Sequence, residues 1–452
     1  MIPLQPATAG PPPPQWRAPT RRHVDGAARL ARLLDAPHRL GMFAGAVMLA
    51  AAALWWGAML ALRAAGVAVP WAVSPTTAHA VLMVFGFVPF FFAGFLFTAG
   101  PRWLGLPPVA ARSLVLPIAA MALGWLSAVV GFHVSAPLAA LGLALGAGGF
   151  ALLTGRFGLL VLQSRATDKD HPKLVFAGCA VAAISLWAAA VAVALEQDAL
   201  VRAAAHFALW AGIGVVFASV AHRMIPFFTA SALPTVQAWR PRVLLGLLVG
   251  LIAVQAPLAA GDVLFAAGDV QFAAGDAVTT GGWPAAMQAL RAVIELAGGA
   301  LLLWLALRWG LVQSLAIRLL AMLHMGFFWL GVAFVLGGVS HALMAASGGT
   351  LSLGLAPLHA FTMGYLGSTL IAMATRVVCG HSGRTLAADN WAWAMFWALQ
   401  VGIVARVLSA LIPAAATPLT LLAVQFWIAA VGAWALRYGR WLLKPRADGQ
   451  PG

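Results

Sequence analysis

The sequence predicts an all-α fold, a polytopic transmembrane helix bundle of about twelve helices with both termini inside. Two features of composition carry this prediction: 62% of the 452 residues are hydrophobic and only 9% are charged. A soluble domain usually carries roughly 25% charged residues, so lipid must be the solvent for most of this chain. Lipid admits only helices or closed barrels. The apolar runs are continuous and lack the period of two that a barrel strand needs.

Apolar segments long enough to cross a bilayer follow one another along the chain. A spanning helix needs about 20 residues, and by that length we expect twelve helices, at 40–63, 77–99, 112–132, 137–161, 174–195, 203–224, 243–260, 285–307, 318–346, 355–378, 390–411 and 416–437. The transmembrane domain is thus expected over 40–437. The proline- and arginine-rich residues 1–39 are expected to form a disordered cytoplasmic tail, and residues 438–452 a second tail.

The positions of the basic residues orient the helices, because cytoplasmic loops of membrane proteins carry an excess of Lys and Arg. With the N-terminus inside, 23 of the 27 Lys and Arg residues fall at cytoplasmic ends, and four lie at or near the outer face: Arg63, Arg202, Arg291 and Arg406. The net charge of +15 does not indicate nucleic-acid binding, since the arginines are scattered singly between apolar runs. We expect a multi-pass protein in the lipid bilayer of a bacterial inner membrane.

One outer segment differs from the rest of the chain. Residues 259–279 read AAGDVLF, AAGDVQF and AAGDAVT, a tandem seven-residue repeat without Lys or Arg. Gly and Asp at each period favour turns, so we expect an outer loop over 261–284. We assign it no chemistry, and the remote alternative is calcium binding by Asp262, Asp269 and Asp276.

Histidines inside the expected helices are the main candidates for chemistry, because ionisable residues are costly in lipid. Four of them lie on four helices in one layer, roughly 5–10 Å below the outer surface at 1.5 Å of rise per residue. They are His79, His206, His341 and His359. For any single histidine, a packed or carbonyl-bonded side chain is the alternative. The shared depth favours a metal or haem site, since neutral imidazole is a common ligand of haem iron and copper.

A second group of histidines lies at the cytoplasmic side and is the less favoured metal site: His222, His324 and His381. The neighbouring arginines are candidates for pairing with propionate or phosphate groups, namely Arg223, Arg376 and Arg384. For any single arginine the stronger alternative is simple anchoring at the cytoplasmic face.

Other polar or small residues carry structural expectations. Glu295 is the only carboxylate well inside an expected helix, with Arg291 one turn earlier. This i,i+4 spacing favours a pair that neutralises itself, and a proton relay through Glu295 is the alternative. A run of glycines indicates close packing of helices and no nucleotide site, because no strand precedes it; the run comprises Gly142, Gly146, Gly148 and Gly149.

Three segments resemble the NnrS family, whose members are twelve-helix inner-membrane proteins associated with haem, copper and the nitric oxide response. The segments are HAVLMVFGFVPFFFAGFLFTAGPRWLGLPP (79–108), AHRMIPFFTASALP (221–234) and LHAFTMGYLGSTLIAMATRVVCGHSGRTL (358–386). The resemblance extends from about the first expected helix to the twelfth. The last segment is the most specific, because its histidines, glycines and arginines have the spacing of the family.

The resemblance also assigns individual residues. His79 matches the first histidine of the family motif W-H-A-H-E-M, but Val81 and Leu82 stand where its second histidine and its glutamate would be. His359 opens the motif of the tenth helix, and the end of that motif matches Arg376, His381, Gly383 and Arg384. The family-like segment IPFFT follows His222 and Arg223. The resemblance therefore implies haem b, with copper as a second metal that lacks one expected ligand.

The leading hypothesis is a haem-binding, or haem- and copper-binding, membrane protein that limits nitric oxide or nitrosative stress. Its site is expected in the outer half, with cofactor contacts from His79, His206, His341, His359, Arg376 and Arg384. Enzymatic turnover and protection of metal pools both remain open. The alternatives are a multi-pass transporter, which would usually have charged sites at mid-membrane, and an assembly factor for respiratory metalloenzymes.

Overall fold

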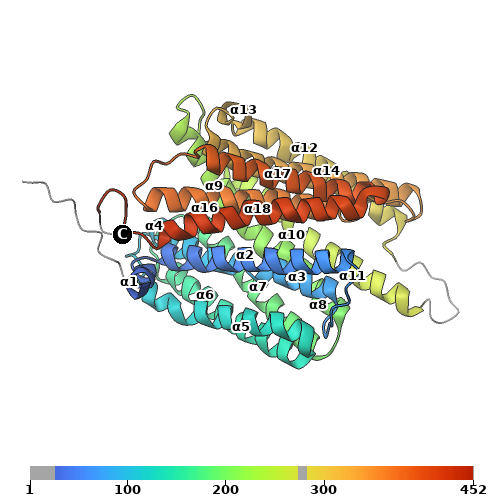
Figure 1. The fold of residues 1–452 in the computed structure, drawn as a ribbon. Coiled ribbons are helices and arrows are strands. Elements are labelled where there is room, and N and C mark those ends of the chain that lie inside the picture. The colour runs from blue at the N-terminus through green and yellow to red at the C-terminus, as the bar shows by residue number, and fades with distance from the viewer. Residues whose placement is uncertain (1–25, 273–281, 451–452) are drawn as a thin grey trace, which may run out of the picture.

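The computed structural model describes residues 26–272 and 282–450. In these two ranges the chain forms helices joined by turns, and they contain no strand. Figure 1 shows most helices lying side by side along one common direction in a single bundle. The all-α class expected from the apolar composition is confirmed.

Twelve helical passages make up the bundle, several of them built from consecutive helices. In chain order they are α2 (Pro37–Ala64), α3 with α4 (Pro75–Phe85, Val88–Leu104), η2 with α5 (Ala111–Leu114, Val115–Val134), α6 (Ala136–Gln163), α7 (Asp170–Ala194), α8 with η3 and α9 (Asp198–Phe207, Ala208–Gly214, Val215–Ala232), α10 with α11 (Arg242–Ala253, Gln255–Phe272), α12 (Ala285–Arg308), α14 (Arg318–Ala346), α15 with η4 and α16 (Ala356–His359, Ala360–Gly367, Ser368–His381), α17 (Asn390–Leu411) and η5 with α18 (Pro413–Ala415, Ala416–Leu442). Three short helices lie outside these passages: α1 (Gly26–Ala31), η1 (Arg32–Leu34) and α13 (Leu311–Ser314).

Eleven of the passages are long and apolar enough to cross a membrane by length and composition. The twelfth, α15 with η4 and α16, is less apolar because it carries His359, Tyr365 and several hydroxyl side chains. Its side chains nevertheless pack inside the bundle, where Tyr365 is fully buried. The twelve expected segments therefore all correspond to helical passages, and two of them, 318–346 and 390–411, have the expected bounds.

The start of the first passage and the end of the last passage lie at the same end of the bundle, as an even number of crossings requires. The Arg39 Nη1 at the start of α2 donates to the carbonyl oxygens of Leu442 (2.7 Å) and Lys444 (2.8 Å), just at and beyond the end of α18. Figure 1 shows the C-terminus beside α1 at one end of the bundle. This arrangement confirms that the two ends share one side, which the distribution of basic residues identifies as the inside.

The tails differ from the expected boundaries. Residues 26–39 were expected to be disordered, but they contain α1, η1 and the first turn of α2, while residues 1–25 lie outside the described part. Pro37 at the first position of α2 has a backbone angle suited to a helix start. At the other end, α18 continues to Leu442, five residues past the expected limit of 437. Burial of His38 and Arg39 in the bundle explains the earlier start.

The Gly/Asp repeat is also more helical than expected. Residues 261–272 were expected to be loop, but α11 extends through the first two repeats to Phe272, and residues 273–281 lie outside the described part. The physical reason is a tertiary contact, because Arg291 of α12 makes a bidentate ion pair with Asp262 at 2.7 and 2.8 Å. Asp262 is thus taken by an arginine, whereas the side chains of Asp269 and Asp276 lie outside the described part.

Glycines allow α5 and α6 to approach closely. A Cβ on Gly142 would lie 2.4 Å from the backbone nitrogen of Ala128, and one on Gly149 would lie 2.6 Å from the carbonyl oxygen of Pro117. From the other helix, a Cβ on Gly124 would lie 2.4 Å from the nitrogen of Gly146. Small residues permit this kind of backbone contact in membranes, and the expected close packing is confirmed at Gly142, Gly146 and Gly149, whereas Gly148 faces the Trp187 side chain of α7.

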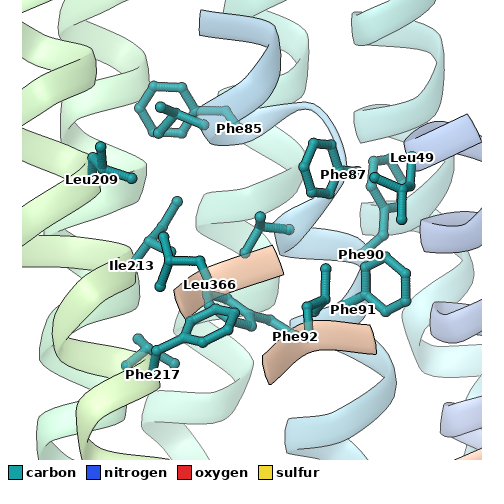
Figure 2. Close-up of a cluster of buried hydrophobic side chains, with 14 of the residues drawn as sticks. Leu49, Phe85, Phe87, Phe90, Phe91, Phe92, Leu209, Ile213, Phe217 and Leu366 are labelled. Atoms are coloured by element: carbon teal, nitrogen blue, oxygen red, sulfur yellow. The ribbon is translucent and has the colours of Figure 1, made fainter. Parts of the chain in front are cut away.

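Besides the one-residue interruption at Val254 between α10 and α11, three passages depart from regular α-helix in the middle of the bundle. The second passage breaks between α3 and α4 at Gly86 and Phe87, and the segments η3 and η4 are π-helical. Figure 2 shows Phe85 and Phe87 at the break, with Leu209 and Ile213 from η3 and Leu366 from η4 in the same cluster. Because π-helical segments inside α-helices occur frequently at functional sites, these passages are the first place to look for one.

Candidate cofactor site in the outer half of the bundle

A cavity of about 470 Å³ lies among these irregular passages. Its walls come from α2, the α3–α4 passage, the α8–η3–α9 passage, the α15–η4–α16 passage, α17 and α18. The lining is largely apolar, with a few histidines, arginines and threonines. Cofactor and small-molecule sites have this character, with volumes of roughly 300–1,000 Å³ and a small number of placed polar groups.

Three histidines from three different passages line this cavity: His79, His206 and His359. His79 lies on α3 ahead of the break, His206 lies two residues before η3, and His359 directly precedes η4. Each of the three irregular passages thus contributes one histidine to the same space. These are three of the four histidines expected to form the outer layer.

Hydrogen bonding leaves ring nitrogens of these histidines available. The Nδ1 of His359 lies 2.9 Å from the carbonyl oxygen of Leu355, and since a carbonyl can only accept, Nδ1 carries the proton. In the neutral ring the lone pair of His359 is therefore on Nε2. Metal-bound histidines whose Nδ1–H donates to a backbone carbonyl adopt the same tautomer. The Nδ1 atoms of His79 and His206 are buried and have no hydrogen-bond partner in the described residues. The Nδ1 atoms of His171 and His324 are also buried without a partner, but only those of His79 and His206 belong to side chains that line the cavity.

Aromatic packing orients one of the three rings. The His79 imidazole stacks on Trp56 of α2, with ring centroids 4.1 Å apart and planes inclined by 22°. Trp56 also lines the cavity. The contact restricts the rotation of His79 about its side-chain bonds, so its ring edge keeps one orientation in the cavity wall.

Three arginines line the same cavity, and they are three of the four that lie near the outer face: Arg63, Arg202 and Arg406. Arg406 donates to Ser409 Oγ at 2.7 Å and Arg202 donates to Thr77 Oγ1 at 3.3 Å. No ion pair forms between these three guanidinium groups and any carboxylate of the described residues. The cavity is therefore cationic as well as apolar.

His341 does not line the cavity, in contrast to the expectation for the outer layer. Its Nδ1 lies 2.6 Å from Glu295 Oε2, and the two side chains are 14% and 6% exposed. Arg291 pairs with Asp262 and not with Glu295, so the expected i,i+4 neutralisation is wrong. Depth in the membrane predicted that His341 shares a layer with the other three histidines, and sequence spacing predicted a pair between Arg291 and Glu295. In the structure, His341 and Arg291 each contact a carboxylate on another helix.

The second histidine layer is occupied by contacts within the protein. His222 Nδ1 lies 3.0 Å from the Nε2 of His171, and His222 Nε2 lies 3.2 Å from the carbonyl oxygen of Pro241. His324 Nε2 shares a hydrogen bond of 2.8 Å with Thr229 Oγ1. The ring centroid of His381 lies 4.4 Å from that of His38. None of these histidines lines the cavity.

The arginines expected to contact a cofactor at the cytoplasmic side pack on aromatic rings. The Arg376 guanidinium lies 3.7 Å from the centroid of Phe228, and that of Arg384 lies 4.4 Å from the ring of Trp441. Neither arginine lines the cavity. The structure thus does not bring these two arginines together with the outer histidines.

Sequence reasoning missed several residues of the site and of the second layer. Arg63, Arg202 and Trp56 were not assigned to the site, although the two arginines were visible as exceptions to the inside bias of charge. His171 and His38, the partners in the second layer, gave no signal in the sequence. Their pairing joins helices that are far apart along the chain.

The fit to a cofactor depends on how many ligands the protein must supply. In the described residues no three His, Cys, Asp or Glu side chains are grouped so that they could hold a metal ion. Val81 and Leu82, which replace the second histidine and the glutamate of the family motif, are each 1% exposed and do not line the cavity. A porphyrin needs only one or two protein ligands for its iron. The residues therefore fit haem, and the described residues hold no group of three side chains for a copper ion.

A family of known proteins matches nearly the whole chain. The family described as NnrS protein matches residues 32–446, which include all twelve helical passages and every residue of the cavity. No curated protein matches the chain. Since the match covers nearly the whole sequence, the chain belongs to the NnrS family.

Proposed function

We propose that this protein binds haem b in the outer-half cavity and acts in the nitric oxide response of a bacterial inner membrane, protecting the cell from nitrosative stress. The observation that carries the proposal is the convergence of three histidines, each from an irregular passage, on one largely apolar cavity. Family membership supports the link to nitric oxide.

His359 is the strongest candidate for an axial ligand. Its Nδ1–H is held by the Leu355 carbonyl, so the ring is oriented and its Nε2 is free to bind iron. His79 and His206 line the same cavity and have buried, unpartnered Nδ1 atoms, so either of them is a candidate for a second contact. When bound, haem iron would supply a coordination position that nitric oxide can occupy.

The apolar side chains that line the cavity affect how a bound haem would interact with small ligands. Phe87, Leu209 and Ile213 line the cavity and belong to the buried cluster in Figure 2. They exclude water from the space around the histidines, which lowers the local polarity and so adjusts how the cofactor binds small neutral ligands. Nitric oxide, being small and uncharged, crosses such an apolar environment readily.

A transporter is disfavoured by the placement of Glu295, the one carboxylate buried in the described part of the chain. Transport sites near mid-membrane usually have charged groups at broken helices. Glu295, however, is bonded to His341 on a regular helix pair and does not line the cavity. The broken passages contribute three histidines and Arg202 to the cavity, and no acidic side chain of the described residues lines it.

The experiment is optical and elemental analysis of the detergent-purified full chain. We expect a Soret band, about one iron per chain, and a shift of the band when nitric oxide is added to the reduced protein. Cells expressing the chain should also grow better under nitric oxide than cells expressing His359→Ala. Absence of both iron and the Soret band, after purification with haem supplied during expression, would overturn the proposal.

A further inference from the structure

The three cavity arginines form no ion pair with a carboxylate of the described residues, although a membrane protein strongly favours pairing or hydrating a cation at this depth. Arg63 is the second-last residue of α2, Arg202 is the fifth of α8, and Arg406 lies five residues before the end of α17. All three are therefore within about 8 Å of the outer helix ends at 1.5 Å per residue. They come from three separate passages and meet at one cavity.

The opposite end of the cavity is apolar and much deeper. Ile371 and Val431 line it, and each lies fifteen residues from the first residue of its passage or helix at the outer side, Ala356 and Ala416. Fifteen residues of helix correspond to roughly 22 Å. The cavity thus changes from cationic near the outer surface to hydrocarbon-like toward the middle of the membrane.

This gradient selects an amphiphilic anion, with acidic groups at one edge and an apolar body. Haem b has this form, since its two propionates lie on one edge of the ring and its vinyl and methyl groups on the others. Arginine is suited to carboxylates because its planar guanidinium can donate two parallel hydrogen bonds. Three arginines provide enough donors for both propionates.

We propose that Arg63, Arg202 and Arg406 bind the haem propionates, so that haem lies with its acidic edge toward the outer surface and its apolar edge toward the middle of the bundle. This inference rests on the proposed function. It replaces Arg376 and Arg384, which stack on Phe228 and Trp441 away from the cavity, as the partners of the acidic groups. The arginines are positioning residues and make no contact with the iron.

The test compares haem with its dimethyl ester, in which both propionate charges are removed. Apoprotein is titrated with each compound and the ratio of the two dissociation constants is measured from the Soret band. We expect wild type to prefer haem over the ester by at least about tenfold, since a hydrogen bond to a charged group contributes that much or more. The triple variant Arg63→Gln, Arg202→Gln, Arg406→Gln should lose this preference.

The ratio cancels effects that the substitutions have on folding or on partition into detergent. The matched control is Arg112→Gln, which changes an exposed arginine of η2 outside the cavity and should keep the wild-type ratio. If the triple variant does not fold, resonance Raman of wild-type protein provides a second readout, because hydrogen-bonded propionates shift their bending band relative to free haem in detergent.

The outcomes separate the two proposals. If wild type binds neither compound, haem binding itself fails and this inference fails with it. If wild type binds both compounds but the triple variant has the same ratio as wild type, haem binding stands and the assignment of the arginines is overturned. Loss of the preference in the triple variant, but not in Arg112→Gln, supports it.

Discussion

Histidines near the outer face and histidines near the cytoplasmic face of this bundle have opposite surroundings. At the outer side, His79, His206 and His359 surround a cavity of about 470 Å³. At the cytoplasmic side, His222 faces His171 at 3.0 Å and His381 faces His38 with ring centroids 4.4 Å apart. Both groups lie on membrane helices, and the residue type is the same. What separates them is that the outer histidines line a cavity, whereas the cytoplasmic ones contact other side chains and do not line it.

The comparison teaches that burial of a histidine in a membrane helix does not by itself indicate a ligand site. His341 makes the point, because it lies at the outer side but is bonded to Glu295 and resembles the cytoplasmic group in its surroundings. A paired histidine uses one ring nitrogen within the protein and so contributes to stability, although the Nδ1 atoms of His171 and His324 have no partner in the described residues. A histidine on a cavity keeps a nitrogen for a ligand. Substitutions in the two groups should therefore have separable effects.

The largest effect is expected for His359→Ala. Removal of the oriented imidazole should lower the haem retained per chain by at least about tenfold, because the iron loses a protein ligand. Haem content is measured by the pyridine haemochrome spectrum of purified protein. The thermal unfolding of the apoprotein should change little. Full haem retention in this variant would show that another histidine of the cavity is the required ligand.

Glu295→Ala tests the histidine that lies at the outer side without reaching the cavity. The change leaves Nδ1 of the part-buried His341 without its partner at 2.6 Å, and we expect a loss of about 1–3 kcal/mol in the free energy of unfolding, the cost of an unsatisfied hydrogen-bonding group inside the protein. Unfolding in detergent measures it. Glu295→Gln, which keeps an acceptor, should lose less. Haem content should be unchanged in both variants. A stable Glu295→Gln protein without haem would contradict the distinction between cavity histidines and paired histidines.

His222→Ala makes the matching change at the cytoplasmic side. It removes the partner of a buried nitrogen of His171 and the contact with the Pro241 carbonyl, so we expect a loss of about 1–2 kcal/mol in the free energy of unfolding. The measurement is the same unfolding experiment, with the Soret band recorded in parallel. Loss of haem at normal stability would move the cofactor site to this end of the bundle.

The smallest effect is expected at the cytoplasmic surface. Asp389 caps α17 and pairs with Arg437 of α18, and the hydrogen bond from Arg437 lowers the pKa of its carboxyl. Because the folded pKa is below the unfolded one, the stabilisation is present above about pH 4 and is lost as the pH falls further. The Asp389 side chain is 53% exposed, so solvent screening limits the contribution to about 1 kcal/mol or less.

Asp389→Asn isolates this charge, since Asn is as good a helix N-cap as Asp. The free energy of unfolding should fall slightly at pH 7, and the difference from wild type should shrink as the pH falls through the folded pKa of Asp389, with haem binding unchanged throughout. A difference that does not shrink on acidification would assign the effect to the cap and not to the ion pair.

The helices could be predicted because hydrophobicity acts along the chain. All twelve expected segments correspond to helical passages, and the Gly142 region packs against α5 as expected. The depth of the site in the membrane could be predicted in the same way, since position along a helix sets depth. The direction of a side chain around its helix depends on neighbouring helices, and this is why His341 was grouped with the cavity histidines although it faces α12.

The irregular backbone segments could not be predicted from the sequence. A π-helical segment changes the hydrogen-bonding pattern of a few residues without changing their hydrophobicity, so η3 and η4 left no trace in an apolar run. The repeat in α11 was predicted to be a loop for a related reason. Gly and Asp favour turns locally, but an ion pair with Arg291 of another helix holds Asp262 in a helix here.

The sequence by itself determined that this protein is a helical membrane bundle with twelve crossings and a fixed orientation, since lipid leaves few options for the backbone and charge bias orients the loops. Only the tertiary structure decided which polar groups face one another and which face a cavity. Packing brought His79, His206 and His359 together with three uncompensated arginines, and it paired the remaining buried histidines within the protein. The physical reason is that helix formation is local, whereas the partner of a buried polar group comes from elsewhere in the chain.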